Sequence, residues 1–184
     1  MDAYCDPNAM RDCFVVLRDL WASDAALQRS FLGVCHGTPF LSLVVPAYGT
    51  DAVDPDTVLN PRGTRSWLGL LGHQHHPHIN VVLRVRMSWP PVLALHLKRD
   101  RLVGGKPTKV SHHVRIPFGT TLGDDGFYAL RGVIVHEGMG AGTGHFAAFV
   151  LRGGRWYYCS DESYRECPEA EVAACQAYLS FYSP

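Results

Sequence analysis

The stretch GVIVHEGMGAGTGHFAAFVLRGGRWYYCSD, residues 132–161, constrains the fold more than any other part of the chain. Its first two apolar runs are rich in branched and aromatic residues, which predicts two strands joined by a glycine-rich loop. A third apolar run, 156–159, follows an Arg-Gly-Gly-Arg turn, which predicts an antiparallel hairpin. A hairpin of this length brings the start of one strand near the end of the next. We therefore expect His145 and Asp161 to lie together at one end of a sheet.

Outside this stretch the pattern indicates helices first and strands afterwards. Apolar residues recur at three- and four-residue spacing between Val16 and Trp21, which predicts a helix starting near residue 13. Asp24 has the features of a cap that opens a second short helix ending near Gly33. Strands are predicted at 40–45, 79–85, 92–97, 109–116, 128–135, 145–151, 156–159 and 177–182, a surface loop at 46–63, and a short helix at 169–176. This order predicts an α+β fold with an antiparallel sheet.

Composition limits the kinds of partner and the cellular setting. The 184 residues suit one domain, and 17 basic residues balance 17 acidic ones, so there is no charge excess for nucleic acid or a membrane surface. No apolar run approaches the roughly 20 residues of a spanning helix, and the N-terminus lacks a signal-peptide pattern. Six cysteines in a chain of this length suggest reduced thiols. We therefore expect an intracellular, cytoplasmic protein.

Three residues suit nucleophilic catalysis by a cysteine. Such a cysteine needs a base to accept its proton and a third group that orients the base. Cys13 starts the first predicted helix, where unpaired backbone N–H groups and the helix dipole stabilise a thiolate. His145 and Asp161 supply a base on one strand and an acid after the next strand. This arrangement is papain-like.

Several stretches carry a resemblance to a known family. They are YALRGVIVHEGMGAGTGHFAAFV, RWYYCSDESY, AYLSFYSP, WPPVLALHLKRD and NAMRDCFVVLRDLWASDAALQRSFL. Each is similar to a characteristic box of the ubiquitin-specific proteases, which are papain-like deubiquitinating cysteine peptidases. The resemblance implies a single compact catalytic domain over 1–184. Helices of a small thumb would occupy about 1–38, and a β-rich palm with residual fingers about 39–184.

The resemblance also implies a reaction and a set of site residues. Cys13 would attack the carbonyl after the C-terminal Gly-Gly of ubiquitin or a ubiquitin-like modifier, with His145 as the base. Asn8 and backbone N–H groups near Cys13 would stabilise the oxyanion. The glycine-rich loop would form a lid over a narrow channel for the Gly-Gly tail. The implied substrate-binding residues are Gly138, Gly140, Gly142, Gly144 and Phe146.

Departures from the family pattern lead to further expectations. The family often holds zinc in two Cys-x-x-Cys pairs, which this chain lacks, so we expect fingers reduced to a stub and no metal or cofactor. A histidine cluster at 73–78 is expected to be a solvated loop. The third position of the triad falls on Ser160, where Asp or Asn is commoner, and Asp161 follows directly. Because a carboxylate orients an imidazole more strongly than a hydroxyl does, Asp161 is expected to take that role.

Some alternatives stay open at the level of sequence. The weakened cysteine box is also compatible with a catalytically weak or inactive module that binds ubiquitin. The compact chain is compatible with a minimal viral or parasite enzyme, or with a protease that processes its own polyprotein, and we expect a monomer or part of a larger polyprotein. Cys5, in CDPNAM, is a second candidate nucleophile, but it needs a seven-residue insertion to align the following helix. We therefore favour Cys13.

Overall fold

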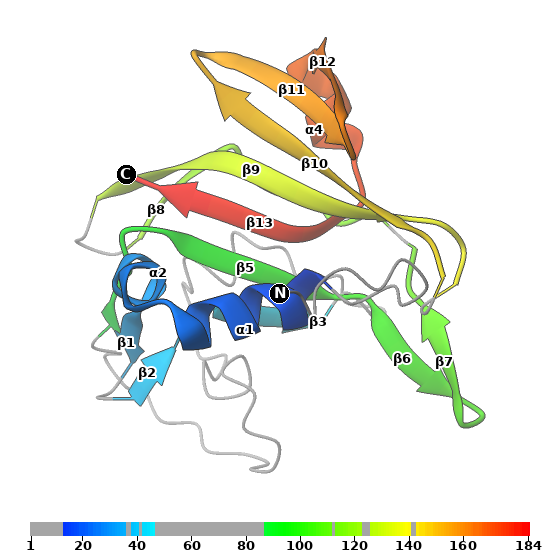
Figure 1. Cartoon of the computed structure of the whole chain (residues 1–184), viewed down its shortest axis with the longest axis horizontal. Helices are drawn as coiled ribbons and strands as arrows, with labels where there is room; N and C mark the ends of the chain where they lie inside the picture. Colours follow the sequence, from blue (N-terminus) through cyan, green and yellow to red (C-terminus); the bar gives the residue numbers. More distant parts are fainter. Residues whose placement is uncertain are drawn as a thin grey trace.

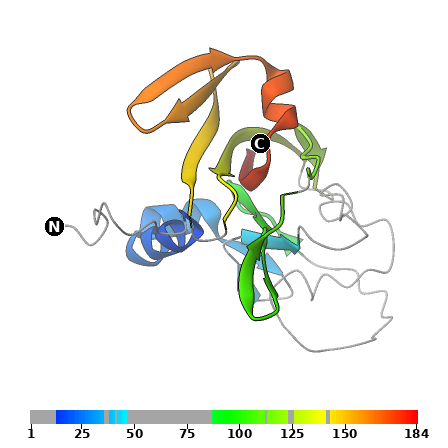
Figure 2. The same cartoon turned by 90° about the vertical axis from the view of Figure 1, so that its right-hand side faces the viewer.

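The computed structural model describes residues 13–35, 38–40, 42–46, 87–111, 113–122, 126–140 and 143–184. An eight-stranded sheet forms its centre, and Figure 2 shows helices α1 (Cys13–Ser23) and α2 (Ala25–Phe31) on one side of it and α4 (Glu169–Ala174) on the other. The strands are β1 (Gly33–Cys35), β2 (Thr38–Phe40), β3 (Ser42–Pro46), β4 (Met87–Ser88), β5 (Leu93–Lys98), β6 (Asp100–Val103), β7 (Lys106–Lys109), β8 (Gly119–Thr121), β9 (Phe127–Glu137), β10 (His145–Arg152), β11 (Arg155–Ser160), β12 (Ser163–Cys167) and β13 (Ala177–Ser183).

The central sheet has the strand order β12-β11-β10-β9-β13-β5-β3, with β8 also paired to β9 (Figure 1). All of its pairings are antiparallel except that of β3 with β5, which is parallel. The predicted antiparallel sheet is therefore confirmed apart from this one pair. A parallel pair needs a long crossover connection, and the chain between Pro46 and Leu93 is long enough to provide one. Two smaller sheets, β2-β1-β4 and β6-β7, complete the β structure of the described residues.

The cap residue Asp24 and the ring of Phe31 fix the position of helix α2. Asp24 caps α2, as predicted: its carboxylate accepts hydrogen bonds from the backbone N–H groups of Ala26, at 2.7 Å, and Leu27, at 3.0 Å. Those hydrogen bonds, led by the one from Leu27, lower the pKa of Asp24. The ring of Phe31 then packs edge-on against Phe181 of β13, with the ring centroids 6.2 Å apart. This contact fixes α2 against the central sheet.

The hairpin predicted from the Arg-Gly-Gly-Arg turn is confirmed. Arg152 of β10 pairs with Arg155 of β11, and the two glycines between them have φ values of 59° and 77°. A tight turn of this hand requires positive φ at both central residues, which glycine adopts without steric cost. The short turn sets the register of β10 against β11 and so decides which side chains lie on the same face.

The strand predicted over 109–116 was wrong beyond Lys109, where β7 ends. The described residues after it include the buried side chains of Val114 and Ile116, which explains the alternating pattern in the sequence. Burial of these side chains reflects packing of an unpaired segment against the core and not pairing in a sheet. The backbone N–H of Val110 bonds instead to the carbonyl oxygen of Arg99, at 2.7 Å.

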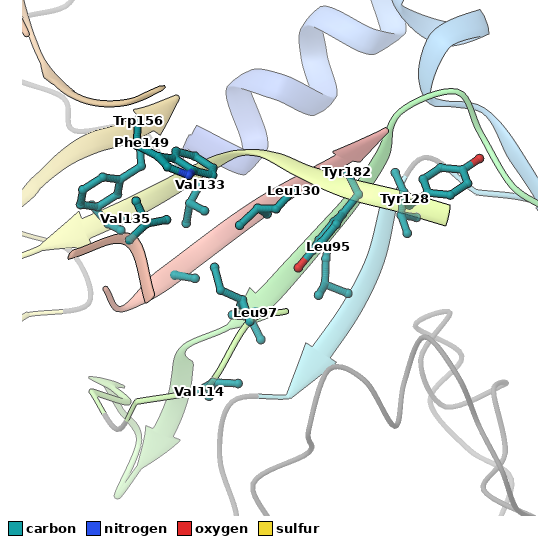
Figure 3. Packing of buried hydrophobic residues seen from close by; sticks show 14 of the residues in the cluster. Leu95, Leu97, Val114, Tyr128, Leu130, Val133, Val135, Phe149, Trp156 and Tyr182 are labelled. Atoms are coloured by element: carbon teal, nitrogen blue, oxygen red, sulfur yellow. The ribbon is translucent and has the colours of Figure 1, made fainter. Parts of the chain in front are cut away.

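A core of aliphatic and aromatic side chains lies between the central sheet, the segment that follows β7, and α4 (Figure 3). Leu95, Leu130 and Tyr182 are buried almost completely. The Tyr182 hydroxyl donates a hydrogen bond to the carbonyl oxygen of Pro117, at 3.0 Å, so its one polar group is satisfied inside the core. The strand register at the end of this core positions the candidate site.

Other predicted elements had mixed outcomes. The strands predicted at 92–97, 128–135, 145–151, 156–159 and 177–182, and the helix at 169–176, are confirmed with shifts of one or two residues at most of their ends. Strand β12 was missed because its sequence, SYREC, is polar. The strand predicted at 79–85 and most of the loop predicted at 46–63 lie outside the described residues. In the part of the chain that the structure describes, no helix combines the length and apolarity needed to cross a bilayer.

Candidate active site

Polar side chains lie at one end of the central sheet, on the same face as the core. Along β9 and β10 the register pairs Val133 with Phe149, Val135 with Ala147, and Glu137 with His145. Because side chains alternate between the two faces of a strand, the four core residues in these pairs share their face with Glu137 and His145. All four are at most 5% exposed. The pattern that builds the core therefore also delivers the histidine to the sheet end.

The same alternation operates on β11. Trp156 is buried in the core, so Tyr158 and Ser160 lie on the core-facing side of the strand. The structure brings Ser160 to His145: the imidazole Nε2 is 2.8 Å from the serine Oγ. A hydrogen bond at Nε2 leaves Nδ1 available for a second partner, which is what a catalytic base requires.

Asp161 lies just beyond the strand end. Its Oδ2 atom is 3.9 Å from His145 Nε2, which is longer than a hydrogen bond. The residue has φ 49°, in the left-handed region, where the two-residue turn between Ser160 and Ser163 begins. The Asp161 side chain is 83% exposed and that of His145 is 39% exposed. Solvent therefore screens the attraction between the two groups.

Cys13 is the first residue of α1 and carries a reduced, half-buried thiol. In Figure 1 the N-terminal end of α1 points to the end of the sheet at which β10 starts, and in Figure 2 the start of β10 lies next to the helices. Backbone N–H groups in the first turn of a helix and the helix dipole favour a thiolate. The role of Cys13 as a nucleophile stays a prediction.

The other reduced cysteines among the described residues have less suitable surroundings. Burial raises the pKa of Cys175 to about 11, although the nearby Arg99 guanidinium acts in the opposite direction. Burial also raises the pKa of Cys167, and the neighbouring Glu171 carboxylate raises it further. Both are therefore poor thiolates at neutral pH. Cys159 is half-buried on β11, on the face opposite to Ser160.

The glycine-rich loop enters the site next to the histidine. Lys109 fixes its first turn, because the Nζ atom donates hydrogen bonds to the carbonyl oxygens of His136, at 2.7 Å, and Gly138, at 2.5 Å. Burial lowers the pKa of Lys109, and the nearby Arg99 lowers it further while Glu137 opposes both. Gly140 and Gly144 also lie in the described part of the loop.

Phe146, predicted to contact substrate, lies on the opposite face from His145. Its ring packs between His136, at 4.7 Å, and Tyr178, at 5.5 Å, measured between ring centroids. These contacts give Phe146 a packing role at the base of the loop, and its role toward substrate stays a prediction. Asn8, Gly142, Cys5 and the histidines at 73–78 lie outside the described residues, so the expectations for them also stay predictions.

A contact that was not predicted from the sequence lies close to His145. The Tyr158 hydroxyl donates a hydrogen bond to Glu137 Oε1, at 2.7 Å. Residues 137, 145, 158 and 160 all belong to the same face, so the alternation of the strands was the available signal. In the described part of the chain no group of three or more His, Cys, Asp or Glu side chains is arranged to hold a metal ion.

We expect Gly144→Ala to lower the rate of any reaction that uses His145 as its base by up to about 10²-fold, because small displacements of catalytic groups are costly. Gly144 has φ 152°, and an added Cβ atom would lie 2.1 Å from the Glu137 carbonyl oxygen and 2.6 Å from His136 Nε2. The backbone next to His145 would therefore have to move. Steady-state kinetics measured together with thermal unfolding checks this expectation.

Gly153→Ala is the matched control for that substitution. Gly153 also has positive φ, at 59°, but a Cβ atom added there would have no neighbouring heavy atom within 4 Å. This variant should lose some stability and retain its kcat. A Gly144→Ala protein with unchanged kcat would show that the loop does not fix the position of His145.

The comparison with known families assigns the chain to one of them. The family model described as ubiquitin carboxyl-terminal hydrolase matches residues 84–182, more than half of the chain. The chain therefore belongs to the ubiquitin carboxyl-terminal hydrolase family, the group of ubiquitin-specific proteases that its sequence resembles. The matched range includes His145 and Ser160 and begins well after Cys13.

Individual relatives agree with this assignment. Ubiquitin carboxyl-terminal hydrolase 44-B of Xenopus laevis is 36% identical over 110 residues, covering 51% of this chain and 16% of that protein. Ubiquitin carboxyl-terminal hydrolase 3 of Mus musculus is 32% identical over 105 residues, covering 50% of this chain and 20% of that protein. The match thus spans a fifth or less of the length of these relatives.

A solved structure extends the likeness to nearly the whole chain. The SAGA Ubp8/Sgf11/Sus1/Sgf73 DUB module bound to ubiquitin aldehyde matches with a TM-score of 0.63 and 20% sequence identity, over 95% of this chain and 49% of that chain. At this identity the likeness shows the fold alone. It confirms the predicted α+β fold of the ubiquitin-specific protease type.

Proposed function

We propose that this chain is a cysteine-type deubiquitinase that hydrolyses the bond after the C-terminal Gly-Gly of ubiquitin or a ubiquitin-like modifier. Membership of the ubiquitin carboxyl-terminal hydrolase family supports the class of reaction. The hydrogen bond between His145 Nε2 and Ser160 Oγ is the observation that carries the proposal, because it orients a base at the sheet end toward which α1 points. Cys13 is the proposed nucleophile, at the first position of α1.

The proposed reaction is acyl transfer in two steps. His145 accepts the thiol proton of Cys13 at Nδ1, and the thiolate attacks the carbonyl carbon of the terminal glycine. The protonated imidazole then gives its proton to the leaving amine, which leaves a thioester on Cys13. In the second step His145 takes a proton from water, and the resulting attack releases the glycine carboxylate and the thiol. Asn8 and backbone N–H groups would stabilise the oxyanion in both steps.

Ser160, and not Asp161, is proposed as the group that orients His145. Ser160 lies within hydrogen-bonding distance of Nε2, whereas Asp161 is 3.9 Å away and mostly exposed. This assignment reverses the preference drawn from the sequence. In the proposed geometry, Nε2–H donates to Ser160 Oγ, which fixes the tautomer with a free lone pair on Nδ1.

We expect the purified chain to form a covalent adduct with ubiquitin carrying a C-terminal electrophile and to hydrolyse a fluorogenic ubiquitin conjugate, with the same rate in chelator. The sequence lacks the Cys-x-x-Cys pairs that bind zinc in many members, so no metal should be needed. Mass spectrometry and fluorescence measure the two outcomes. His145→Ala serves as the control and should abolish both.

Two outcomes would change the proposal. Ubiquitin binding without adduct formation would favour the inactive, ubiquitin-binding module. Loss of activity in chelator, restored by zinc, would contradict the reduced fingers. The relatives described above come from vertebrates, so they give no support to a viral origin or to processing of a viral polyprotein.

A further inference from the structure

A lysine at the end of β7 contacts the backbone at the root of the glycine-rich loop. Lys109 Nζ donates hydrogen bonds to the carbonyl oxygens of His136, at 2.7 Å, and Gly138, at 2.5 Å. Those two residues flank Glu137, which pairs with His145 across β9 and β10. In Figure 1 the β6–β7 hairpin extends from the sheet on the side where β9 passes into β10. A side chain from this hairpin thus holds the backbone that lies next to the proposed base.

The two hydrogen bonds lie where β9 passes beyond its pairing with β13. That pairing runs along β9 as far as Val135. The two carbonyl groups held by the lysine share one donor, so they face the same edge of β9. The carbonyl oxygen of Glu137 faces the β10 edge instead, because a Cβ atom added at Gly144 would lie 2.1 Å from it. The ammonium group therefore acts on the edge opposite to β10, in the place of a strand neighbour.

The backbone that carries this lysine is tied to the core. Arg99 is 3% exposed, and its guanidinium donates hydrogen bonds to the carbonyl oxygens of Ala177, at 2.6 Å, and Val110, at 3.1 Å. The backbone N–H of Val110 donates in return to the carbonyl oxygen of Arg99, at 2.7 Å. Ala177 is the first residue of β13 and pairs with Val135. Lys109, which directly precedes Val110, therefore reaches the loop from a fixed position.

The two ends of the glycine-rich loop are in close contact with each other. Gly138 has φ 118°, and a Cβ atom added there would lie 2.9 Å from Gly144 Cα and 3.0 Å from the Thr143 carbonyl oxygen. Glycine permits this approach of two backbones because it has no side chain. A displacement of Gly138 would therefore displace Gly144, the residue that precedes His145.

We propose that Lys109 is a positioning residue for His145: its ammonium group holds the root of the glycine-rich loop and, through the contact between the loop ends, the backbone of the base. The inference rests on the proposed function, in which His145 accepts the thiol proton. An ammonium group suits this position because it is a compact cation with three donors and can serve two carbonyl oxygens at once. Hydrogen bonds from a charged donor are also stronger than those between neutral groups.

The test compares Lys109→Met with Lys109→Arg on a fluorogenic ubiquitin conjugate. Methionine lacks a donor, so kcat should fall by about tenfold, as expected when a catalytic group is slightly displaced. KM should change by less than about twofold, because the loss concerns the base and not the binding of substrate. Arginine keeps the charge and the donors, and it should retain about half of kcat or more. Equal losses in the two variants would overturn the proposal.

Hydrogen exchange measures how firmly the loop root is held. In Lys109→Met the amides of residues 136–140 should exchange at least about threefold faster, because the segment opens more readily, and the turn at 152–155 should be unaffected. Lys106→Met and Lys98→Met are the matched controls, since each removes an exposed lysine, from β7 and from β5. Both controls should retain kcat and the exchange rates. Unaltered exchange in Lys109→Met would overturn the proposal.

A reaction without ubiquitin keeps this inference separate from the proposed function. The rate of Cys13 alkylation by iodoacetamide, followed by peptide mass spectrometry near neutral pH, depends on the base that accepts the thiol proton. Slower alkylation in Lys109→Met, in a chain that does not cleave ubiquitin, would support the positioning role and refute the deubiquitinase. Ubiquitin cleavage by Lys109→Met at the unaltered rate would support the deubiquitinase and overturn the positioning role. Slower cleavage with unaltered alkylation would assign Lys109 to substrate binding and also overturn it.

Discussion

Replacement of Cys13 by alanine should abolish both ubiquitin-probe labelling and hydrolysis, with a loss in kcat on the order of 10⁶-fold, as when a nucleophile is removed from a protease triad. The expected loss follows from the chemistry of a cysteine nucleophile and from the position of Cys13 in α1. Cys13 is the first described residue of α1, at the helix end whose dipole favours a thiolate, and its thiol is reduced and half-buried. Intact mass after reaction with the probe, together with steady-state kinetics, measures the loss.

Cys5→Ala and Cys159→Ala are the controls for this experiment. Cys5 is the competing nucleophile from the sequence, and Cys159 is a half-buried, reduced cysteine on the far face of β11. Both variants should label at the rate of the unaltered chain. Labelling that survives Cys13→Ala and disappears in Cys5→Ala would assign the nucleophile to Cys5, and it would remove Asn8 from the oxyanion role.

Local signals in the sequence predicted the parts of the fold that depend on neighbouring residues. The capping preference of Asp24 predicted the start of α2, and the two glycines after Arg152 predicted the tight turn between β10 and β11. The juxtaposition of His145 with the residues at the end of β11 follows from that turn. These features need no knowledge of the rest of the chain.

Features that depend on residues far apart in the sequence could not be predicted from local signals. The parallel pairing of β3 with β5 joins segments separated by a long connection. The buried alternation of Val114 and Ile116 resembles a strand, although the segment packs on the core without pairing. The contact of Glu137 with Tyr158 joins two strands that flank β10, and only the three-dimensional sheet reveals it.

The sequence indicated only in part whether Ser160 or Asp161 orients His145. Trp156 is an apolar residue, and counting in steps of two along the strand from it places Tyr158 and Ser160 on the core side, which is also the side of His145. The chemical argument that a carboxylate orients an imidazole better than a hydroxyl favoured Asp161. The structure places Ser160 Oγ 2.8 Å from His145 Nε2, as the periodicity indicates, and the choice of orienting group stays a prediction.

Ser160→Ala should therefore reduce kcat more than Asp161→Ala does. Loss of the hydroxyl leaves Nε2–H without its partner and frees the ring to rotate and to change tautomer, so we expect a loss of about 10²-fold, within the range that general base catalysis contributes. Asp161 is 3.9 Å from the imidazole and 83% exposed, and its removal should cost less than about fivefold. Steady-state kinetics at low and high salt checks both values, and only the small effect of Asp161 should diminish with salt.

Glu162→Ala is the matched control, since it removes an exposed carboxylate from the same turn. Thermal unfolding should show all three variants folded, because the site lies at the sheet end and outside the core formed by Leu95, Leu130 and Tyr182. A larger loss from Asp161→Ala than from Ser160→Ala would mean that the turn after β11 closes on His145 when ubiquitin binds. In that case a carboxylate that is exposed in the free chain would become the orienting group in the complex.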